Sequence, residues 1–173
     1  MRKEIYNNKS KMNHIKKLME ADTAVMMNSF EPLTDIKKIV HSNQLYLGCS
    51  MLDAHSWIEL DDGTIIDYDV RDLKETSAFG SLDVIRVPFP LKLQLELLPY
   101  VKKIINAFNN ALEGLTEKDR EDINNNIRNT VGKCILRTYI MKQVFLSKGI
   151  KCKVVYGSLG FKQPNNQYFY EFG

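Results

Sequence analysis

The amino-acid sequence predicts an α+β fold in which helices pack against an antiparallel β-sheet. Helical periodicity fills the start of the chain and much of its second half, whereas two other regions alternate in the manner of strands. Turn signals, Asp62-Gly63 in the first region and Pro164-Asn-Asn in the second, indicate that each of these regions forms a hairpin. Helices, a hairpin, more helices and a final hairpin is an order typical of this class.

Length and composition restrict the possible functions. The chain has 173 residues without an internal repeat or a low-complexity linker, so we predict a single domain spanning residues 1–173. A formal net charge of +3 from scattered lysines is too small for a phosphate-binding surface, and we expect no nucleic-acid partner. Three cysteines do not make a disulfide framework. Without a signal peptide or an apolar span, we expect a cytoplasmic location and no membrane partner.

Periodicity and end signals predict the individual elements. In chain order these are helices at 12–27 and 32–42, strands at 44–51, 55–60 and 64–69, a strand with an irregular loop at 77–91, helices at 99–115, 116–128 and 131–148, and strands at 151–161 and 167–172. Pro32 suits a first helical turn, Thr116 suits an N-cap, and Gly149 suits the end of a helix. The 99–115 helix has the clearest amphipathic pattern.

The predicted hairpin at 55–69 brings a histidine close to two aspartates. If a three-residue Asp-Asp-Gly loop closes the hairpin, both aspartates lie on the face of His55, with Asp69 directly across and Asp67 diagonal. A two-residue turn would put both on the other face. A histidine base needs such a partner on its second ring nitrogen, because the partner fixes the tautomer and stabilises the charged form.

The helix at 131–148 is apolar on nearly every side, which predicts a central, buried position. Cys134 lies within its first turn, directly after Gly132 and Lys133. Unpaired backbone N–H groups and the positive end of the helix dipole stabilise a thiolate there. Gly132 leaves room for a substrate and Lys133 adds positive charge. Cys134 is therefore the candidate nucleophile.

Other interpretations of the cysteines remain open. Cys134 would also suit a packed core, which is the commonest environment of a free cysteine. Cys49 is the second candidate nucleophile because it lies shortly before His55, although its apolar surroundings favour packing. Cys152 alternates with lysines in a predicted strand and is expected to point into the core.

Two motifs carry a family resemblance. The segment from Gly132-Lys-Cys134 to Gly149-Ile-Lys-Cys-Lys-Val-Val-Tyr-Gly157 resembles the cysteine helix, strand and glycine of the transglutaminase-like group of the papain-like cysteine protease superfamily. The segment His55-Ser-Trp-Ile-Glu-Leu-Asp-Asp-Gly-Thr-Ile-Ile-Asp67 is similar to that group's histidine strand, hairpin glycine and aspartate. The family runs Cys, His, Asp, whereas here the histidine and aspartate come first, as in a circular permutation. A triad is defined by geometry rather than by chain order, so permutation is physically acceptable.

The resemblance implies a papain-like core, in which a central Cys-bearing helix packs on an antiparallel sheet with extra helices around it. It implies a triad of Cys134, His55 and Asp67, with Asp69 as the alternative third member, and no cofactor. The implied chemistry is acyl transfer through a thioester. Hydrolysis of an amide bond in a peptide or protein substrate is favoured, because water needs no second binding site. Transglutaminase, deamidase and acetyltransferase reactions on the same triad are alternatives.

Two further expectations complete the hypothesis. Trp57 either forms a wall of the active-site cleft or packs in the core. No metal site is predicted, because no second Cys or His lies close to Cys134 in the sequence to share a zinc ion.

The alternative from another class is an inactive papain-shaped module whose groove binds a partner peptide. An activated Cys134 thiolate would distinguish the enzyme from this module.

Overall fold

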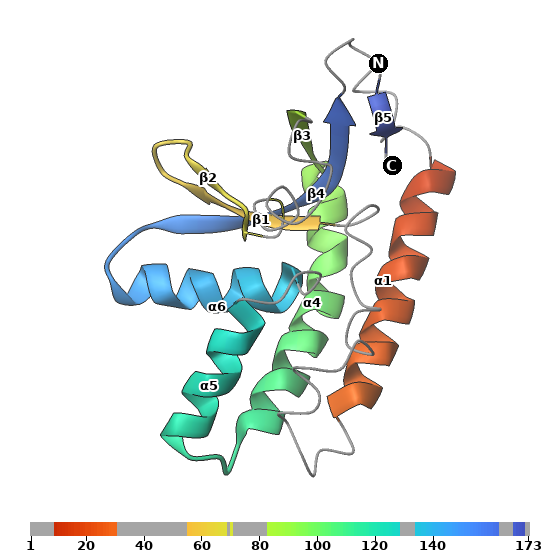
Figure 1. Ribbon diagram of the computed structural model, residues 1–173. Coiled ribbons are helices and arrows are strands. Elements are labelled where there is room, and N and C mark those ends of the chain that lie inside the picture. The colour runs from red at the N-terminus through yellow and green to blue at the C-terminus, as the bar shows by residue number, and fades with distance from the viewer. Residues whose placement is uncertain are drawn as a thin grey trace.

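The computed structural model describes residues 9–30, 55–68, 70, 83–128, 134–162 and 168–171. Within these residues the fold is mixed α+β, with four helices and one antiparallel sheet of five strands (Figure 1). The helices are α1 (Lys9–Phe30), α4 (Leu91–Leu112), α5 (Glu117–Arg128) and α6 (Cys134–Ser147). The strands are β1 (His55–Leu60), β2 (Ile65–Ile66), β3 (Asp83–Pro88), β4 (Cys152–Lys162) and β5 (Tyr168–Glu171). The α+β class predicted from the sequence is confirmed.

The sheet is organised around the long strand β4. Its order is β2-β1-β4-β3, with β5 also pairing with β4, and every pairing is antiparallel. The first half of β4 pairs with β1, and the second half pairs with β3. Gly157 lies at the changeover, opposite His55 on one side and Pro88 on the other. One strand therefore sets the spacing between β1 and β3.

The main core lies among the helices. Helices α1 and α4 run side by side, and α6 crosses beneath β1 and β4 (Figure 1). The buried side chains of α4 form a single stripe: Leu93, Leu97, Val101, Ile104 and Phe108. They share a cluster with Ile15 and Met19 of α1, Ile123 of α5, and Cys134, Ile135, Leu136 and Ile140 of α6. The cysteine at the start of α6 is thus anchored in the core.

The start of α4 differs from the prediction. The helix begins at Leu91 rather than near residue 99, and Pro99 lies inside it. A proline in a helix interior costs about 3 kcal/mol. Burial of Leu93 and Leu97 offsets this, because each buried leucine contributes about 1.5–3 kcal/mol. The prediction of a start at 99 was therefore wrong.

Helix α6 is buried along only part of its length. Its first half is buried, and this half includes the polar residues Arg137 and Thr138. The side chains toward its C-terminus reach solvent, and Leu146 is 46% exposed. The expectation of a central, buried helix is confirmed for the first half only, because the apolar C-terminal half extends past the elements that cover its start.

Several local predictions are confirmed. Thr116 Oγ1 accepts the Asp119 backbone N–H at 3.2 Å, as expected of an N-cap before α5. Gly149 has a φ of 72° and ends α6, with the Ile150 N–H donating to the Phe145 carbonyl at 2.9 Å. The elements predicted at 32–42 and 44–51 lie outside the described residues. Every helix in the described part of the chain is too short or too polar to span a bilayer.

Candidate active site

The turn between β1 and β2 has the conformation that the sequence favours. Gly63 has a φ of 85°, and its N–H donates to the Leu60 carbonyl at 3.0 Å. The Leu60 N–H donates to the Thr64 carbonyl at 2.9 Å, so three residues form the loop. Asp62 Oδ1 accepts the Thr64 N–H at 2.8 Å and closes an Asx-type turn. The three-residue alternative is therefore confirmed, and with it the register of the hairpin.

This register brings His55 and Asp67 together. Ile58 pairs with Ile66, so Asp67 follows β2 on the face of the histidine. His55 Nε2 lies 2.9 Å from Asp67 Oδ1, although the two side chains come from diagonal positions. Both are almost fully buried, with side-chain exposures of 0% and 3%. Asp69, the alternative partner, lies outside the described residues.

Asp67 has a second charged partner, which the sequence analysis missed. Arg86 Nε on β3 donates to Asp67 Oδ2 at 2.8 Å. The sequence signal was a single arginine within the apolar stretch Val84-Ile-Arg-Val87. It was overlooked because 77–91 was assigned to a strand with an irregular loop, and no strand partner could be inferred for it.

The candidate nucleophile lies at the other side of the imidazole. Cys134 is the first residue of α6 and is 1% exposed. His55 Nδ1, the ring nitrogen not directed to Asp67, is buried and makes no hydrogen bond of ordinary geometry in the described residues. Hydrogen-bonding and charge interactions with Cys134 nevertheless raise the pKa of His55, so the thiol lies beside the ring. The structure thus brings Cys134, His55 and Asp67 into one array.

The electrostatics of the array favour a charged imidazole. Burial is the largest influence on His55 and lowers its pKa, because a low-dielectric interior disfavours charge. Asp67 and Cys134 outweigh burial and raise the pKa of His55 to about 10. For Asp67, burial raises the pKa, but His55 and Arg86 together hold it below its ordinary value. An imidazolium hydrogen-bonded to the Asp67 carboxylate is therefore the favoured state of His55 at neutral pH.

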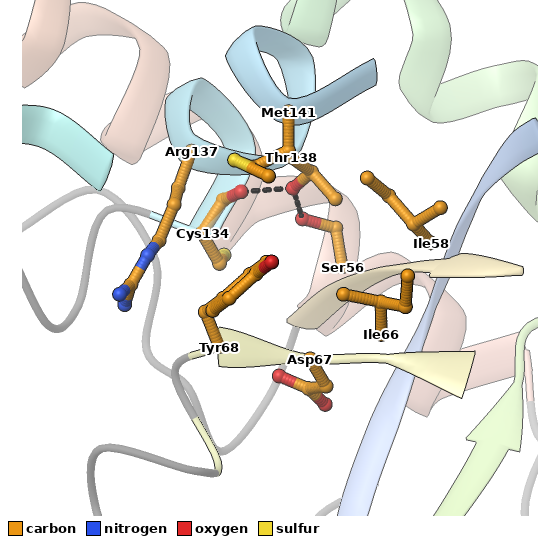
Figure 2. A pocket seen from close by; sticks show the side chains of 9 residues that line it. All are labelled: Ser56, Ile58, Ile66, Asp67, Tyr68, Cys134, Arg137, Thr138 and Met141. Carbon is orange, nitrogen blue, oxygen red and sulfur yellow. Dashed lines mark hydrogen bonds between the residues drawn. The ribbon is translucent and has the colours of Figure 1, made fainter. Parts of the chain in front are cut away.

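A chain of hydroxyl groups ties the histidine strand to the cysteine helix. Thr138 Oγ1 donates to the Cys134 carbonyl, and Ser56 Oγ lies 2.6 Å from Thr138 Oγ1 (Figure 2). A hydroxyl has one hydrogen, so Ser56 is the donor to Thr138. Ser56 directly follows His55, and Thr138 lies one turn after Cys134. These bonds therefore link the strand that carries His55 to the start of the helix that carries Cys134.

Trp57 packs against the histidine. Its ring is stacked with the His55 ring at a centroid distance of 6.2 Å and an interplanar angle of 26°. The side chain is 1% exposed, and its indole N–H donates to Glu59 Oε1 at 3.2 Å. A Cβ atom added at Gly157 would lie 2.5 Å from Trp57 Cη2. The glycine therefore gives the indole the room it needs beside His55.

A pocket opens next to the thiol. Figure 2 shows its lining residues: Ser56, Ile58, Ile66, Asp67, Tyr68, Cys134, Arg137, Thr138 and Met141. The Cys134 side chain points from α6 toward the hairpin, and Arg137 and Tyr68 flank it (Figure 2). The Arg137 guanidinium lies over the Tyr68 ring, 5.6 Å from its centroid. The pocket therefore borders Cys134 on the side that faces the hairpin.

The remaining candidate residues lie elsewhere. Cys152 is half-buried at the start of β4, and His14 is exposed on α1. Cys49 and His41 lie outside the described residues. Within the described ranges, no group of three or more His, Cys, Asp or Glu side chains is arranged to hold a metal ion.

Comparisons of the chain with protein-family models, with curated proteins and with solved structures found no match. The class of protein must therefore be inferred from the site itself. A buried thiol, imidazole and carboxylate in series define a candidate thiol-imidazole site.

Proposed function

We propose that this protein is a thiol-dependent acyl-transfer enzyme that hydrolyses a peptide or amide bond. The observation that carries the proposal is the buried series of Cys134, His55 and Asp67, in which Asp67 bonds His55 Nε2 and Cys134 lies close enough to the ring to raise the pKa of His55. Buried ionisable groups with strongly shifted pKa values concentrate at functional sites. In this proposal the substrate approaches the sulfur from the pocket that Cys134 lines.

The proposed reaction has two stages. The Cys134 thiolate attacks the amide carbonyl carbon and forms a tetrahedral oxyanion. The C–N bond then breaks as His55 gives its proton to the departing amine, which leaves a thioester on the sulfur. A water molecule, deprotonated by His55, attacks the thioester and releases the carboxylic acid and the thiolate. Atoms and protons balance over the two stages, and the enzyme returns to the thiolate–imidazolium state.

The other groups support these steps without reacting. Asp67 holds the imidazole through Nε2, so Nδ1 remains directed at the thiol. The backbone N–H of Cys134, at the start of α6, is a donor for the oxyanion, since the first N–H groups of a helix have no intrahelical partner. We place Trp57 behind the imidazole, where its stacked ring excludes water from one side of His55.

We further propose a circularly permuted papain-like core of the transglutaminase-like type. Helix α6 begins with the cysteine and contacts β1 and β4 of the antiparallel sheet. The histidine opens the adjacent strand β1, and the aspartate follows the hairpin. These features support the likeness, while the chain order of His55, Asp67, Cys134 requires the permutation.

One observation favours a second function. Cys134 and His55 are each only 1% exposed, which would suit an inactive papain-like module that binds a partner peptide without reacting. In such a module Cys134 would behave as a packed core thiol. Amide transfer to an amine, deamidation and acetyl transfer use the same three residues and differ only in the acyl donor and acceptor.

The test is the pH dependence of iodoacetamide labelling, with the modified cysteine identified by mass spectrometry. We expect Cys134 to react rapidly below about pH 7, because a thiolate paired with an imidazolium exists below the ordinary thiol pKa of about 8.5. His55→Ala should slow that reaction by at least about ten-fold. Slow labelling of Cys134 in both proteins would favour the binding module. Rapid labelling of Cys49 instead would mean that the nucleophile is a different cysteine.

A further inference from the structure

The starting observation is that both oxygens of Asp67 are held. Oδ1 lies 2.9 Å from His55 Nε2 and also accepts the Val70 backbone N–H at 3.3 Å. Oδ2 accepts Arg86 Nε at 2.8 Å. A carboxylate held at both oxygens cannot rotate away from the imidazole. The orientation of Asp67, and through it that of His55, therefore depends on a residue from outside the hairpin.

The charges of the site lead to the same residue. A thiolate at Cys134 and an imidazolium at His55 are neutral as a pair. Asp67, with only 3% of its side chain exposed, adds a negative charge that burial makes costly. Arg86 supplies the balancing positive charge, so the four groups alternate in sign and sum to zero. Without Arg86, the state required for catalysis would include an uncompensated buried anion.

The position of Arg86 is set by the sheet. Arg86 pairs with Leu159 on β4, and His55 pairs with Gly157 on the same strand. Arg86 and His55 thus lie on the two strands that flank β4. Strand β4 sets the distance between these two strands, and the Asp67 carboxylate spans it. The Arg86 side chain is 19% exposed, so its guanidinium keeps part of its hydration and is less costly to place there than a fully buried cation.

We propose that Arg86 is a positioning residue for the proposed reaction. It orients the Asp67 carboxylate and balances its charge, so that His55 keeps Nδ1 directed at Cys134. The inference rests on the proposed function and extends the triad to a fourth residue that touches neither the substrate nor the thiol. A guanidinium suits this task because its N–H groups lie in a rigid plane, whereas a lysine ammonium is a point charge on a flexible stem.

The test compares three variants by the labelling rate of Cys134 with iodoacetamide near pH 6.5, with folding monitored by circular dichroism. Arg86→Gln removes the charge, and Arg86→Lys keeps the charge but loses the planar donor. Lys153→Gln is the matched control, because Lys153 pairs with Glu59 on the same sheet but is 70% exposed. We expect Arg86→Gln to slow labelling of the folded protein about ten-fold or more, the lower end of what a correctly placed base contributes. Arg86→Lys should lie between Arg86→Gln and wild type, and Lys153→Gln should equal wild type.

The outcomes separate this inference from the proposed function. If wild-type Cys134 labels rapidly and both folded Arg86 variants label at the same rate or faster, Arg86 is a structural contact only and the inference fails alone. If Arg86→Gln does not fold, Arg86→Lys decides: a wild-type rate overturns the inference, and a rate at least about three-fold lower supports it. If wild-type Cys134 is itself inert, the proposed function fails and the role of Arg86 fails with it.

Discussion

Two carboxylates of the first hairpin are paired in the same way but at different depths. Glu59 accepts the Trp57 indole N–H at 3.2 Å and the Lys153 ammonium at 2.9 Å. Asp67 likewise has a ring N–H partner, His55, and a cation from a neighbouring strand, Arg86. The Glu59 side chain is 22% exposed and the Asp67 side chain 3%. Burial is the main difference between two otherwise similar arrangements.

The difference in depth changes what each arrangement can do. Solvent screens the Glu59 pair, and exposed ion pairs contribute about 0–1 kcal/mol. The bond to Lys153 is the main reason that the pKa of Glu59 is lowered. Around Asp67, burial works against the charge and the pKa is lowered only because His55 and Arg86 outweigh it. The exposed pair is a surface feature, whereas the buried one makes the protonation of His55 depend on Asp67.

The largest expected effect comes from Asp67→Asn. An amide has one oxygen and one NH₂ group, so either His55 Nε2 or Arg86 Nε must face a donor. Removing one partner of a buried charge cluster costs about 3–5 kcal/mol. We expect the unfolding free energy in urea to fall by about 3 kcal/mol and labelling of Cys134 to slow more than in any other variant proposed here except His55→Ala. If Asp67→Asn were as stable as wild type, the negative charge of Asp67 would not be what stabilises the buried cluster with His55 and Arg86.

The pH dependence of Asp67→Asn provides the control. Because the folded-state pKa of Asp67 is below its ordinary value of 3.8, the stabilisation it contributes is present above that pH and is lost as the pH falls through the folded-state value. In acid, the wild-type carboxyl is protonated and resembles the amide. The difference in unfolding free energy between wild type and variant should therefore narrow from about pH 6 to about pH 3. A difference in unfolding free energy that stayed constant with pH would contradict the assignment of this stabilisation to the Asp67 carboxylate.

The next largest effect is expected from Gly157→Ala. The new methyl group would overlap the Trp57 ring and the Val87 carbonyl oxygen, so the strands or the indole must move. Overpacking of this kind costs about 1–3 kcal/mol. Trp57 is the only tryptophan, so its fluorescence reports the displacement directly.

Ser158→Ala is the matched control on the same strand. Ser158 is buried and its Oγ has no hydrogen-bond partner among the described residues, so its loss should change stability little. Equal destabilisation by both substitutions would indicate that β4 tolerates no change here. The close approach of the Trp57 indole to Gly157 would then not be the cause of the destabilisation in Gly157→Ala.

Thr138→Val tests the hydroxyl chain with a side chain of the same shape. It removes the donor to the Cys134 carbonyl and leaves the buried Ser56 hydroxyl without this acceptor. An unsatisfied buried polar group costs about 1–3 kcal/mol, and we expect about 1 kcal/mol by urea denaturation together with slower Cys134 labelling. In the double variant with Ser56→Ala, part of the stability should return. Fully additive losses would show that the two hydroxyls act separately.

The features of the site that could be predicted from the sequence are those set by residues close together in the chain. A pairing of His55 with an aspartate of the hairpin was predicted because turn chemistry is local: Asp62 and Gly63 select the loop, and the loop sets the register. The choice of Asp67 came from the family resemblance. Asp67 and Asp69 could not be separated by spacing alone, since the spacing predicted both on the histidine's face. The cap at Thr116 was likewise predicted from neighbouring residues.

The remaining features depend on segments far apart in the chain. Arg86 meets Asp67 only because β4 lies between β1 and β3 and pairs with both, and no local pattern encodes that pairing. The Ser56–Thr138 bond depends on how α6 packs on β1. The start of α4 was predicted near Pro99, whereas packing against α1 overrides the local preference against a proline inside a helix.

The smallest effect is expected from Glu59→Gln, which completes the comparison of the two carboxylates. The amide oxygen can still accept the Trp57 indole N–H, and the lost pair with Lys153 is largely screened by solvent. We expect a loss below about 1 kcal/mol, which becomes smaller at high salt, since screening weakens exposed pairs. Labelling of Cys134 should match wild type. If Glu59→Gln instead slowed labelling as strongly as Asp67→Asn, depth would not distinguish the two carboxylates, and the stacked Trp57 would be the route by which Glu59 acts on His55.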